Sequence, residues 1–171
     1  MSTKKLYWLL PCLLYCLTAG PARRVEGPDL VPTPDAIEYS LLANALATFN
    51  PPLIQIDQRL YPSRYPLGFP LTLVPFTWIF SFDETKYHWA AFIYGLLAVF
   101  LMARTCGWLL ADRRAGSVAA LLWAAHPQTV YSATHVMSES ALTAGFFVML
   151  ELARPWTVSY THLTLPTILR V

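Results

Sequence analysis

Four long runs of apolar residues lie along the chain, separated by stretches that hold most of its charged residues and prolines. A helix needs about 20 residues to cross the apolar core of a bilayer, with about 17 as a lower limit. The pattern therefore predicts four membrane-spanning helices, at Leu6–Ala22, Trp89–Leu110, Ser117–Tyr131 and Met137–Ala153. Within the third run, His126-Pro127 is expected to end the helix, because proline disfavours helix in the residue before it.

The first apolar run has two interpretations. It follows "MSTKK" and ends in "TAGPA", which are features of a secretory signal peptide. We take an uncleaved membrane anchor as the prediction and a cleaved signal peptide as the alternative. The later runs would hold the chain in the membrane in either case.

A fifth apolar run, Leu67–Phe82, is short for a span and contains Pro70 and Pro75. Each proline removes a backbone donor, and unpaired backbone groups are costly in lipid. We therefore expect a helix over Gly68–Phe82 that lies along the membrane interface. A second short helix is expected over Ala36–Thr48, so that the first large loop carries two juxtamembrane helices.

The distribution of arginine predicts which ends of the helices share a side. Arg113 and Arg114 follow the second span and Arg154 follows the last, whereas the loop His126–Glu139 has no Lys or Arg. The positive-inside rule places the arginine ends in the cytoplasm. The first loop and Glu139 would then face the other side, although the Arg23-Arg24 pair after the first run counts against this orientation.

Composition agrees with a multi-pass protein of a membrane, which we expect to be the inner (plasma) membrane of a bacterium. Hydrophobic residues make up 56% of the chain and charged residues 13%, compared with roughly 25% charged in a soluble domain. A net charge of +2 without a basic run excludes nucleic acid as an expected partner. The three cysteines, Cys12, Cys16 and Cys106, lack zinc-ligand spacing and are expected to be inert.

Asp35 opens an apolar-periodic segment and has an ordinary structural explanation. Asp35 and Glu38 have the spacing of a capping box, in which each carboxylate accepts from an amide of the first helical turn. Apolar residues follow at three- and four-residue spacings and predict the buried face of an amphipathic helix. These residues are Ile37, Leu41, Leu42, Ala45 and Leu46.

The order of segments also resembles a known family. After a short first span come "PDAIEYSLLANAL", "YPSRYPLGFPLTLVPF", "ADRRAGSVAALLWAAHP" and "YSATHVMSESALTAGFFVMLELA". This order resembles the start of a polyprenyl-phosphate-sugar-dependent glycosyltransferase of the GT-C class, in the group of the dolichyl-phosphate-mannose protein mannosyltransferases and aminoarabinose transferases. The fold implied is an all-α integral membrane module of about four spans with a large first external loop. Asp35-Ala36 and Pro66-Leu67-Gly68 depart from the family's usual Asp-Glu and Pro-Pro-Gly, which leaves the sugar open.

The resemblance implies roles for residues of the first loop. Asp35 matches the catalytic acid, and a carboxylate can orient or deprotonate an acceptor hydroxyl. Arg64 is the candidate contact for the donor phosphate, because a guanidinium holds phosphate oxygens with two parallel hydrogen bonds. Tyr65, with Tyr61, is a candidate for lining the lipid or sugar path. The alternatives are an arginine that reaches lipid head groups and tyrosines that are ordinary interfacial aromatics.

Glu139, at the mouth of the fourth span, matches a second acid of the family. It could bind the acceptor, assist Asp35 or ligate a divalent cation, and this cation is the only cofactor that the sequence suggests. The alternative is that Glu139 is a first-turn acid whose charge interacts favourably with the helix dipole. His135 would share a face with Glu139 only if the last helix began early. One His and one acid do not make a metal site, so the metal is left unknown.

The last fifteen residues, 157–171, form neither an apolar span nor a charged loop. The peptide Val158–Thr167, "VSYTHLTLPT", resembles one reading frame of a transposase-type sequencing adaptor, GTC TCT TAT ACA CAT CTG ACG CTG CCG ACG. We therefore expect residues 1–156 to be the amino-terminal part of a membrane glycosyltransferase, inactive alone, and residues 157–171 to be read-through.

The sequence thus predicts a membrane glycosyltransferase that moves a sugar from a polyprenyl-phosphate donor to an acceptor hydroxyl outside the cytoplasm. The lipid bilayer and the donor are its expected partners, and the acceptor, whether protein, lipid or glycan, is open. The alternative is a transporter or channel-like protein, which polar residues inside the spans would favour.

Overall fold

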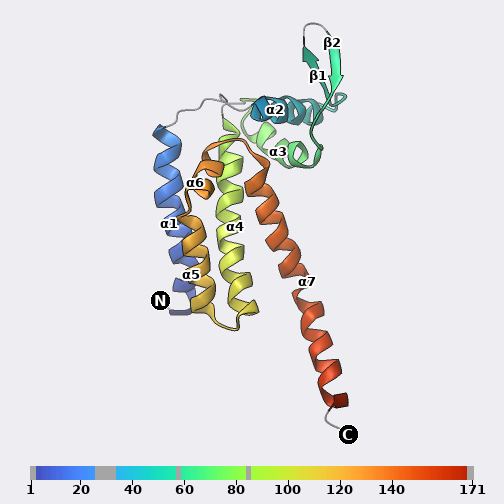
Figure 1. The fold of residues 1–171 in the computed structure, drawn as a ribbon. Helices are drawn as coiled ribbons and strands as arrows, with labels where there is room; N and C mark the ends of the chain where they lie inside the picture. The colour runs from blue at the N-terminus through green and yellow to red at the C-terminus, as the bar shows by residue number, and fades with distance from the viewer. Residues whose placement is uncertain (1–2, 26–33, 57–58, 84–85, 169–171) are drawn as a thin grey trace.

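The computed structural model describes residues 3–25, 34–56, 59–83 and 86–168, with side chains described as far as Trp156 (Figure 1). Seven helices and one hairpin make up these residues. In chain order they are α1 (Thr3–Val25), α2 (Pro34–Ala47), β1 (Leu53–Ile56), β2 (Arg59–Pro62), α3 (Gly68–Ile79), α4 (His88–Leu109), α5 (Arg113–Ala124), α6 (Pro127–Thr134) and α7 (Ser138–Ile168).

The predicted helical fold is confirmed, with one correction. The strands β1 and β2 pair antiparallel, with Leu53 opposite Pro62 and Ile56 opposite Arg59. The prediction of an all-α chain missed this hairpin because each strand has only four residues, too few for an alternating pattern to stand out.

The helices form a bundle that carries a cap at one end. In Figure 1, α1, α4, α5 and α7 run alongside one another, while α2, α3 and the hairpin lie beyond the start of α4 and α7. The two short helices expected in the first large loop are where the sequence places them: α2 covers the predicted Ala36–Thr48 except Thr48, and α3 covers most of Gly68–Phe82. At 12 residues, α3 is too short to cross a bilayer.

Tyrosine side chains fasten the cap to the bundle, and a tryptophan joins the two helices of the cap. The hydroxyl of Tyr87, a fully buried residue, contacts both Asn44 Oδ1 of α2 (2.5 Å) and Thr77 Oγ1 of α3 (2.9 Å). Trp78 Nε1 donates to the Ala47 carbonyl (3.3 Å), and Tyr94 of α4 donates to the Thr72 carbonyl (2.7 Å). Because these hydrogen bonds join three helices, the cap and the start of α4 form one packed unit.

The predicted buried face of α2 is only partly right: Leu42 is fully buried and Ala45 and Leu46 are half-buried, but the other two predicted residues are exposed. Ile37 and Leu41 are 45% and 40% exposed, whereas Ala36, Tyr39 and Ala43 pack in the core of the cap. Small side chains let α2 approach α3 closely, which turns Ile37 and Leu41 outward.

Only part of the predicted set of spans has the length and apolarity of a membrane helix. Among the described residues, α4 alone is long and apolar enough, and it matches the prediction at Trp89–Leu110. The apolar part of α1, Tyr7–Ala22, is shorter. Helices α6 and α7 pass the same test as a pair, but they are bent by 110° at their junction.

The third predicted span, Ser117–Tyr131, is not one helix. Helix α5 ends at Ala124, His126 has extended backbone (φ −69°, ψ 131°), and α6 begins at Pro127. The break follows from proline, as expected at His126-Pro127, and the chain turns into a separate short helix there.

Helix α7 runs from Ser138 to Ile168 and so includes the predicted fourth span. Its backbone continues as a helix into the predicted read-through segment, 157–171. Side chains of that segment, and residues 169–171 entirely, lie outside the described residues. The origin of the tail therefore stays a prediction.

Helix α5 packs against α4 through a glycine. A Cβ added at Gly116 would lie 2.5 Å from the Ala103 carbonyl oxygen and 2.5 Å from the Gly107 amide nitrogen, both backbone atoms of α4. Ala120 and Ala124 continue this buried face. The close contact of the two helices thus depends on the absence of a side chain at Gly116.

Gly116→Ala is expected to loosen this contact. Overpacking of this kind costs roughly 1–3 kcal/mol, so thermal unfolding of the chain in detergent should shift down by several degrees. The matched control is Gly145→Ala on α7, where an added Cβ meets no atom within 4 Å. Alanine is the better helix former, so this variant should unfold at or above the temperature of the original chain. Equal melting temperatures for the two variants would contradict the packing argument.

Candidate functional site

Asp35 lies in the first turn of α2, where it contacts the loop that follows the hairpin. It is half-buried, and its Oδ1 accepts a hydrogen bond of 2.5 Å from the hydroxyl of Tyr65. This hydrogen bond is the main reason that the pKa of Tyr65 is raised, since the phenol must keep its proton to donate it. Two residues that the sequence assigns to one site, Asp35 and Tyr65, are therefore in direct contact.

Glu38, one turn further along α2, fixes the same loop. Its side chain is only 5% exposed. Oε1 accepts from the Ser63 hydroxyl (3.1 Å) and the Arg64 amide (2.8 Å), and Oε2 accepts from Arg64 Nε (3.0 Å) and Nη2 (2.9 Å). Four donors thus surround one carboxylate, and the guanidinium binds it in the two-pronged geometry typical of strong ion pairs.

The pKa of Glu38 reflects two opposing effects. Burial by itself raises it, but the hydrogen bonds from Arg64 and Ser63 and the charge of Arg64 together lower it below its ordinary value. Glu38 is therefore held as a carboxylate. The predicted capping box is not its role, because its oxygens bind the Ser63–Arg64 segment.

Arg64 is held by this ion pair but stays accessible. Its side chain is 69% exposed, and the guanidinium carbon lies 5.6 Å from the centre of the Tyr65 ring. The pairing with Glu38 is the main reason that the pKa of Arg64 is raised. A permanently charged guanidinium with a fixed position can contact an anion that approaches the cap.

Tyr39 lies at the centre of a cluster that also contains Asp35, Arg64, Tyr65 and Glu139, together with Glu38. It is 8% exposed, with its ring 5.1 Å from the Tyr65 ring and 4.9 Å from the Phe69 ring. Burial raises the pKa of Tyr39, a hydrogen bond with Ser138 lowers it in part, and the charges of Asp35, Glu139 and Glu38 raise it further. The Tyr39 phenol therefore lies close enough to acids of both α2 and α7 for their charges to raise its pKa.

Glu139 and its neighbour Ser138 bring the start of α7 into this site. The structure agrees with the expected placement of Asp35 and Glu139 at the same end of the bundle (Figure 1). Glu139 is exposed, and its carbonyl accepts from the Thr143 hydroxyl (2.7 Å). His135 does not share its helix: α7 begins only at Ser138, and the His135 ring stacks on Tyr131 at 4.0 Å.

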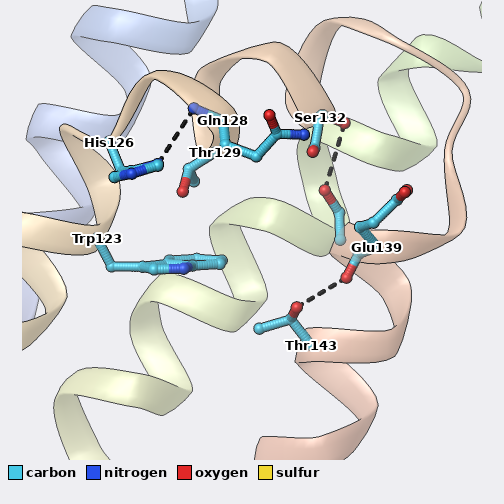
Figure 2. Close-up of a pocket in the computed structure, with 8 residues that line it drawn as sticks. Trp123, His126, Gln128, Thr129, Ser132, Glu139 and Thr143 are labelled. Carbon is cyan, nitrogen blue, oxygen red and sulfur yellow. Dashed lines mark hydrogen bonds between the residues drawn. The ribbon is translucent and has the colours of Figure 1, made fainter.

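A pocket of about 300 Å³, lined mainly by residues with polar side chains, opens beside Glu139, between α5, α6 and α7. Figure 2 shows the flat ring of Trp123 and the ring of His126 on one side of it, with Glu139 and Thr143 on the other. The Ser140 hydroxyl donates to the Ser132 carbonyl (3.3 Å), which holds α7 against α6. The remaining lining residues are Gln128 and Thr129. An aromatic ring among hydroxyl and amide groups suits a polar ligand with many hydroxyls.

A larger, mostly apolar groove of about 610 Å³ lies between α3 and α7. Tyr39 and Ser138 line the groove and connect it to the cluster around Tyr39. Its other lining residues are Pro66, Gly68, Phe69, Thr72, Ala141, Leu142, Gly145, Phe146 and Met149. Ser138 lines the groove and Glu139 lines the pocket, so two neighbouring residues of α7 face two different spaces.

No metal centre is formed by the side chains that the structure describes. Within that part of the chain, no group of three or more His, Cys, Asp or Glu residues could hold a metal ion. A divalent cation at Glu139 therefore has no support beyond the prediction.

Three of the four residues that the sequence selected, Asp35, Tyr65 and Glu139, lie around Tyr39, and the fourth, Arg64, contacts the Tyr65 ring and Glu38. Sequence reasoning missed Tyr39 and Ser138 and gave Glu38 a different role. The spacing carried a signal for Tyr39, which lies four residues after Asp35 and therefore on the same helical face. The role of Glu38 in binding Arg64 was missed because its spacing from Asp35 is that of a capping residue.

Comparison of the chain with protein-family models, with curated proteins and with solved structures finds no match.

Proposed function

We propose that this chain is the donor-binding part of a membrane glycosyltransferase that uses a polyprenyl-phosphate-linked sugar. One observation carries the proposal: Tyr39 lines an apolar groove and Glu139 lines a pocket of polar side chains, and both belong to one cluster with Asp35, Arg64 and Tyr65. A donor of this class has the same three parts, a long apolar chain, a charged phosphate and a polyhydroxyl sugar.

The membrane setting is supported by the outer surface of the bundle. Large apolar side chains are exposed along three of its helices, more than a soluble protein usually leaves uncovered. They are Leu9, Leu10, Leu13 and Leu17 on α1, Val118 and Leu122 on α5, and Leu142, Phe146, Met149 and Leu152 on α7. A bilayer covers such faces, with the cap at one membrane surface.

The proposed mechanism follows from the contacts of the cluster. Asp35 accepts the proton of the acceptor hydroxyl, or orients it, as the acceptor oxygen attacks the sugar carbon that bears the phosphate. The bond from that carbon to the phosphate oxygen breaks, and the departing phosphate takes the electron pair. Arg64, positioned by Glu38, stabilises the negative charge on that phosphate. Tyr65 keeps the Asp35 carboxylate in place through its hydroxyl.

The transporter alternative gains little from the charges in the bundle. Arg104 of α4 pairs with Glu151 of α7 (3.1 Å), and the Thr105 hydroxyl donates to the same carboxylate (3.1 Å). This pair is satisfied by its neighbours and fastens two helices together, near the end of the bundle that is away from the cap (Figure 1).

The proposal is tested by binding of an undecaprenyl-phosphate probe to the chain in nanodiscs. Gly145→Leu adds a side chain to the apolar groove at a position with no atom within 4 Å, so it should fill the groove without disturbing the fold. We expect the dissociation constant to rise roughly tenfold, the effect of about 1.4 kcal/mol of lost binding.

Ala153→Leu is the matched control, since Ala153 is exposed on the same helix and does not line the groove. Its affinity for the probe should be that of the original chain. Lack of binding by the original chain, or unchanged binding by Gly145→Leu, would count against the proposed donor site.

A further inference from the structure

A second pocket lies at the end of the bundle away from the cap. It has a volume of about 480 Å³ and is formed where α4 ends and α5 begins, against α1 and α7 (Figure 1). Its lining residues are Trp8, Phe100, Arg104, Gly107, Trp108, Ala111, Arg113 and Arg154. Three guanidinium groups from three different helices therefore converge on one cavity.

The positive charge in this pocket is only partly balanced. Arg104 is paired with Glu151. Within the described part of the chain, Arg113 makes no ion pair, and Arg154 lies with its guanidinium 5.7 Å from the centre of the Trp108 ring. Because Arg113 makes no ion pair among the described residues, its charge is not balanced within the pocket, which favours an anionic ligand.

Trp108 adds an independent observation. Its indole nitrogen is buried, and among the described residues it has no hydrogen-bond partner. A buried donor without an acceptor costs free energy that a ligand oxygen could recover. The pocket therefore offers both positive charge and an unused hydrogen-bond donor.

We propose that this pocket binds the phosphate of an anionic phospholipid head group. Guanidinium groups hold phosphate oxygens by paired hydrogen bonds, and basic pockets between membrane helices are typical head-group sites at the cytoplasmic surface. Trp8 and Trp108 suit that interface, where tryptophan is enriched. Leu109 and Leu152, exposed on the neighbouring α4 and α7, provide apolar surface for the acyl chains.

This inference depends on the membrane setting but not on sugar transfer. It can hold if the donor site fails, because the two pockets share no residue. An anionic lipid bound here would join α4, α5 and α7 at their arginine-rich ends.

The experiment counts phosphatidylglycerol molecules retained by the chain in native mass spectrometry, after transfer from vesicles of equal phosphatidylglycerol and phosphatidylcholine. The double variant Arg113→Gln/Arg154→Gln should lose retained phosphatidylglycerol at least fivefold. Arg59→Gln, an exposed arginine on the hairpin at the other end, should retain it in full. Equal loss in both variants would mean a nonspecific charge effect and would overturn the proposal.

Two further measurements keep the result interpretable. Arg113→Lys/Arg154→Lys preserves the charge and should restore most of the retained lipid if the double glutamine variant is folded, as circular dichroism would show. Inorganic phosphate at millimolar concentration should not displace phosphatidylglycerol from the original chain. Complete displacement would identify a site for free phosphate, and equal retention of phosphatidylcholine would remove the requirement for an anionic lipid; either result overturns the proposal.

Discussion

Asp35→Asn is expected to lower the rate of sugar transfer by roughly 100- to 10,000-fold, the usual contribution of a general acid or base. Asparagine keeps the size of the side chain and an oxygen that can accept from the Tyr65 hydroxyl, so the local structure should persist. It cannot take a proton from the acceptor. The rate is measured with a radiolabelled polyprenyl-phosphate sugar in membranes that contain the protein encoded by the uninterrupted reading frame.

Two comparisons identify the cause of such a loss. Binding of undecaprenyl phosphate to the Asp35→Asn chain should be unchanged, which separates a catalytic defect from misfolding. Tyr65→Phe removes the hydroxyl that positions Asp35 but leaves the carboxylate, so we expect a smaller loss of rate, roughly tenfold. Full transfer activity in Asp35→Asn would rule out the catalytic role.

The arrangement of the candidate site could be predicted because it depends on the direction of the helices. Counting the crossings and the positions of the arginines put Asp35 and Glu139 at the same end, and the fold places them there. That argument needs only the order of long apolar segments, which is the strongest signal in a sequence of this kind. Whether the bundle crosses a membrane is a separate question, and α4 alone meets that test among the described residues.

The side-chain partners within the site could not be predicted in the same way. Asp35 and Glu38 have the spacing of a capping box, and that local pattern gives no indication that the Ser63–Arg64 segment supplies four donors to Glu38. The pairing joins residues 25 and 26 positions apart across a hairpin. Contacts of this kind depend on tertiary packing, which overrides local propensity.

The buried face of α2 shows a related limit. Periodicity correctly selected Leu42 as buried, but it also selected the exposed Ile37 and Leu41 and missed Ala36, Tyr39 and Ala43. Periodicity identifies the apolar positions of a helix but not which of them meet a neighbouring helix, and close approach of two helices favours small residues at the contact. The same physical reason explains why Gly116 lies at the contact between α4 and α5.

Arg64→Met is expected to destabilise the chain more than Glu38→Gln, because the two partners differ in burial. Loss of Glu38 leaves Arg64, whose side chain is 69% exposed and can be solvated by water. Loss of the Arg64 guanidinium leaves a carboxylate that is 5% exposed, without its counter-ion and without two of its four hydrogen-bond donors. A buried charge without its counter-ion is the more costly outcome.

The pH dependence of unfolding gives this prediction its sharpest test. In the original chain the pKa of Glu38 is below the ordinary value of about 4.3, so the folded state binds fewer protons than the unfolded state and loses stability as the pH falls through that range. In Arg64→Met, burial is no longer offset and the pKa should rise above the ordinary value. The folded variant then binds the extra proton, so its stability deficit should shrink on acidification.

Melting temperatures in detergent from about pH 8 to pH 4 would measure both effects. The gap between the original chain and Arg64→Met should narrow towards low pH, and Arg59→Met, on the exposed hairpin, should show no such gap. The double variant Glu38→Gln/Arg64→Met should be more stable at neutral pH than Arg64→Met alone, because no stranded carboxylate remains. If the two losses simply add, or if the gap is independent of pH, Glu38 is not the buried anion that holds Arg64 at the candidate site.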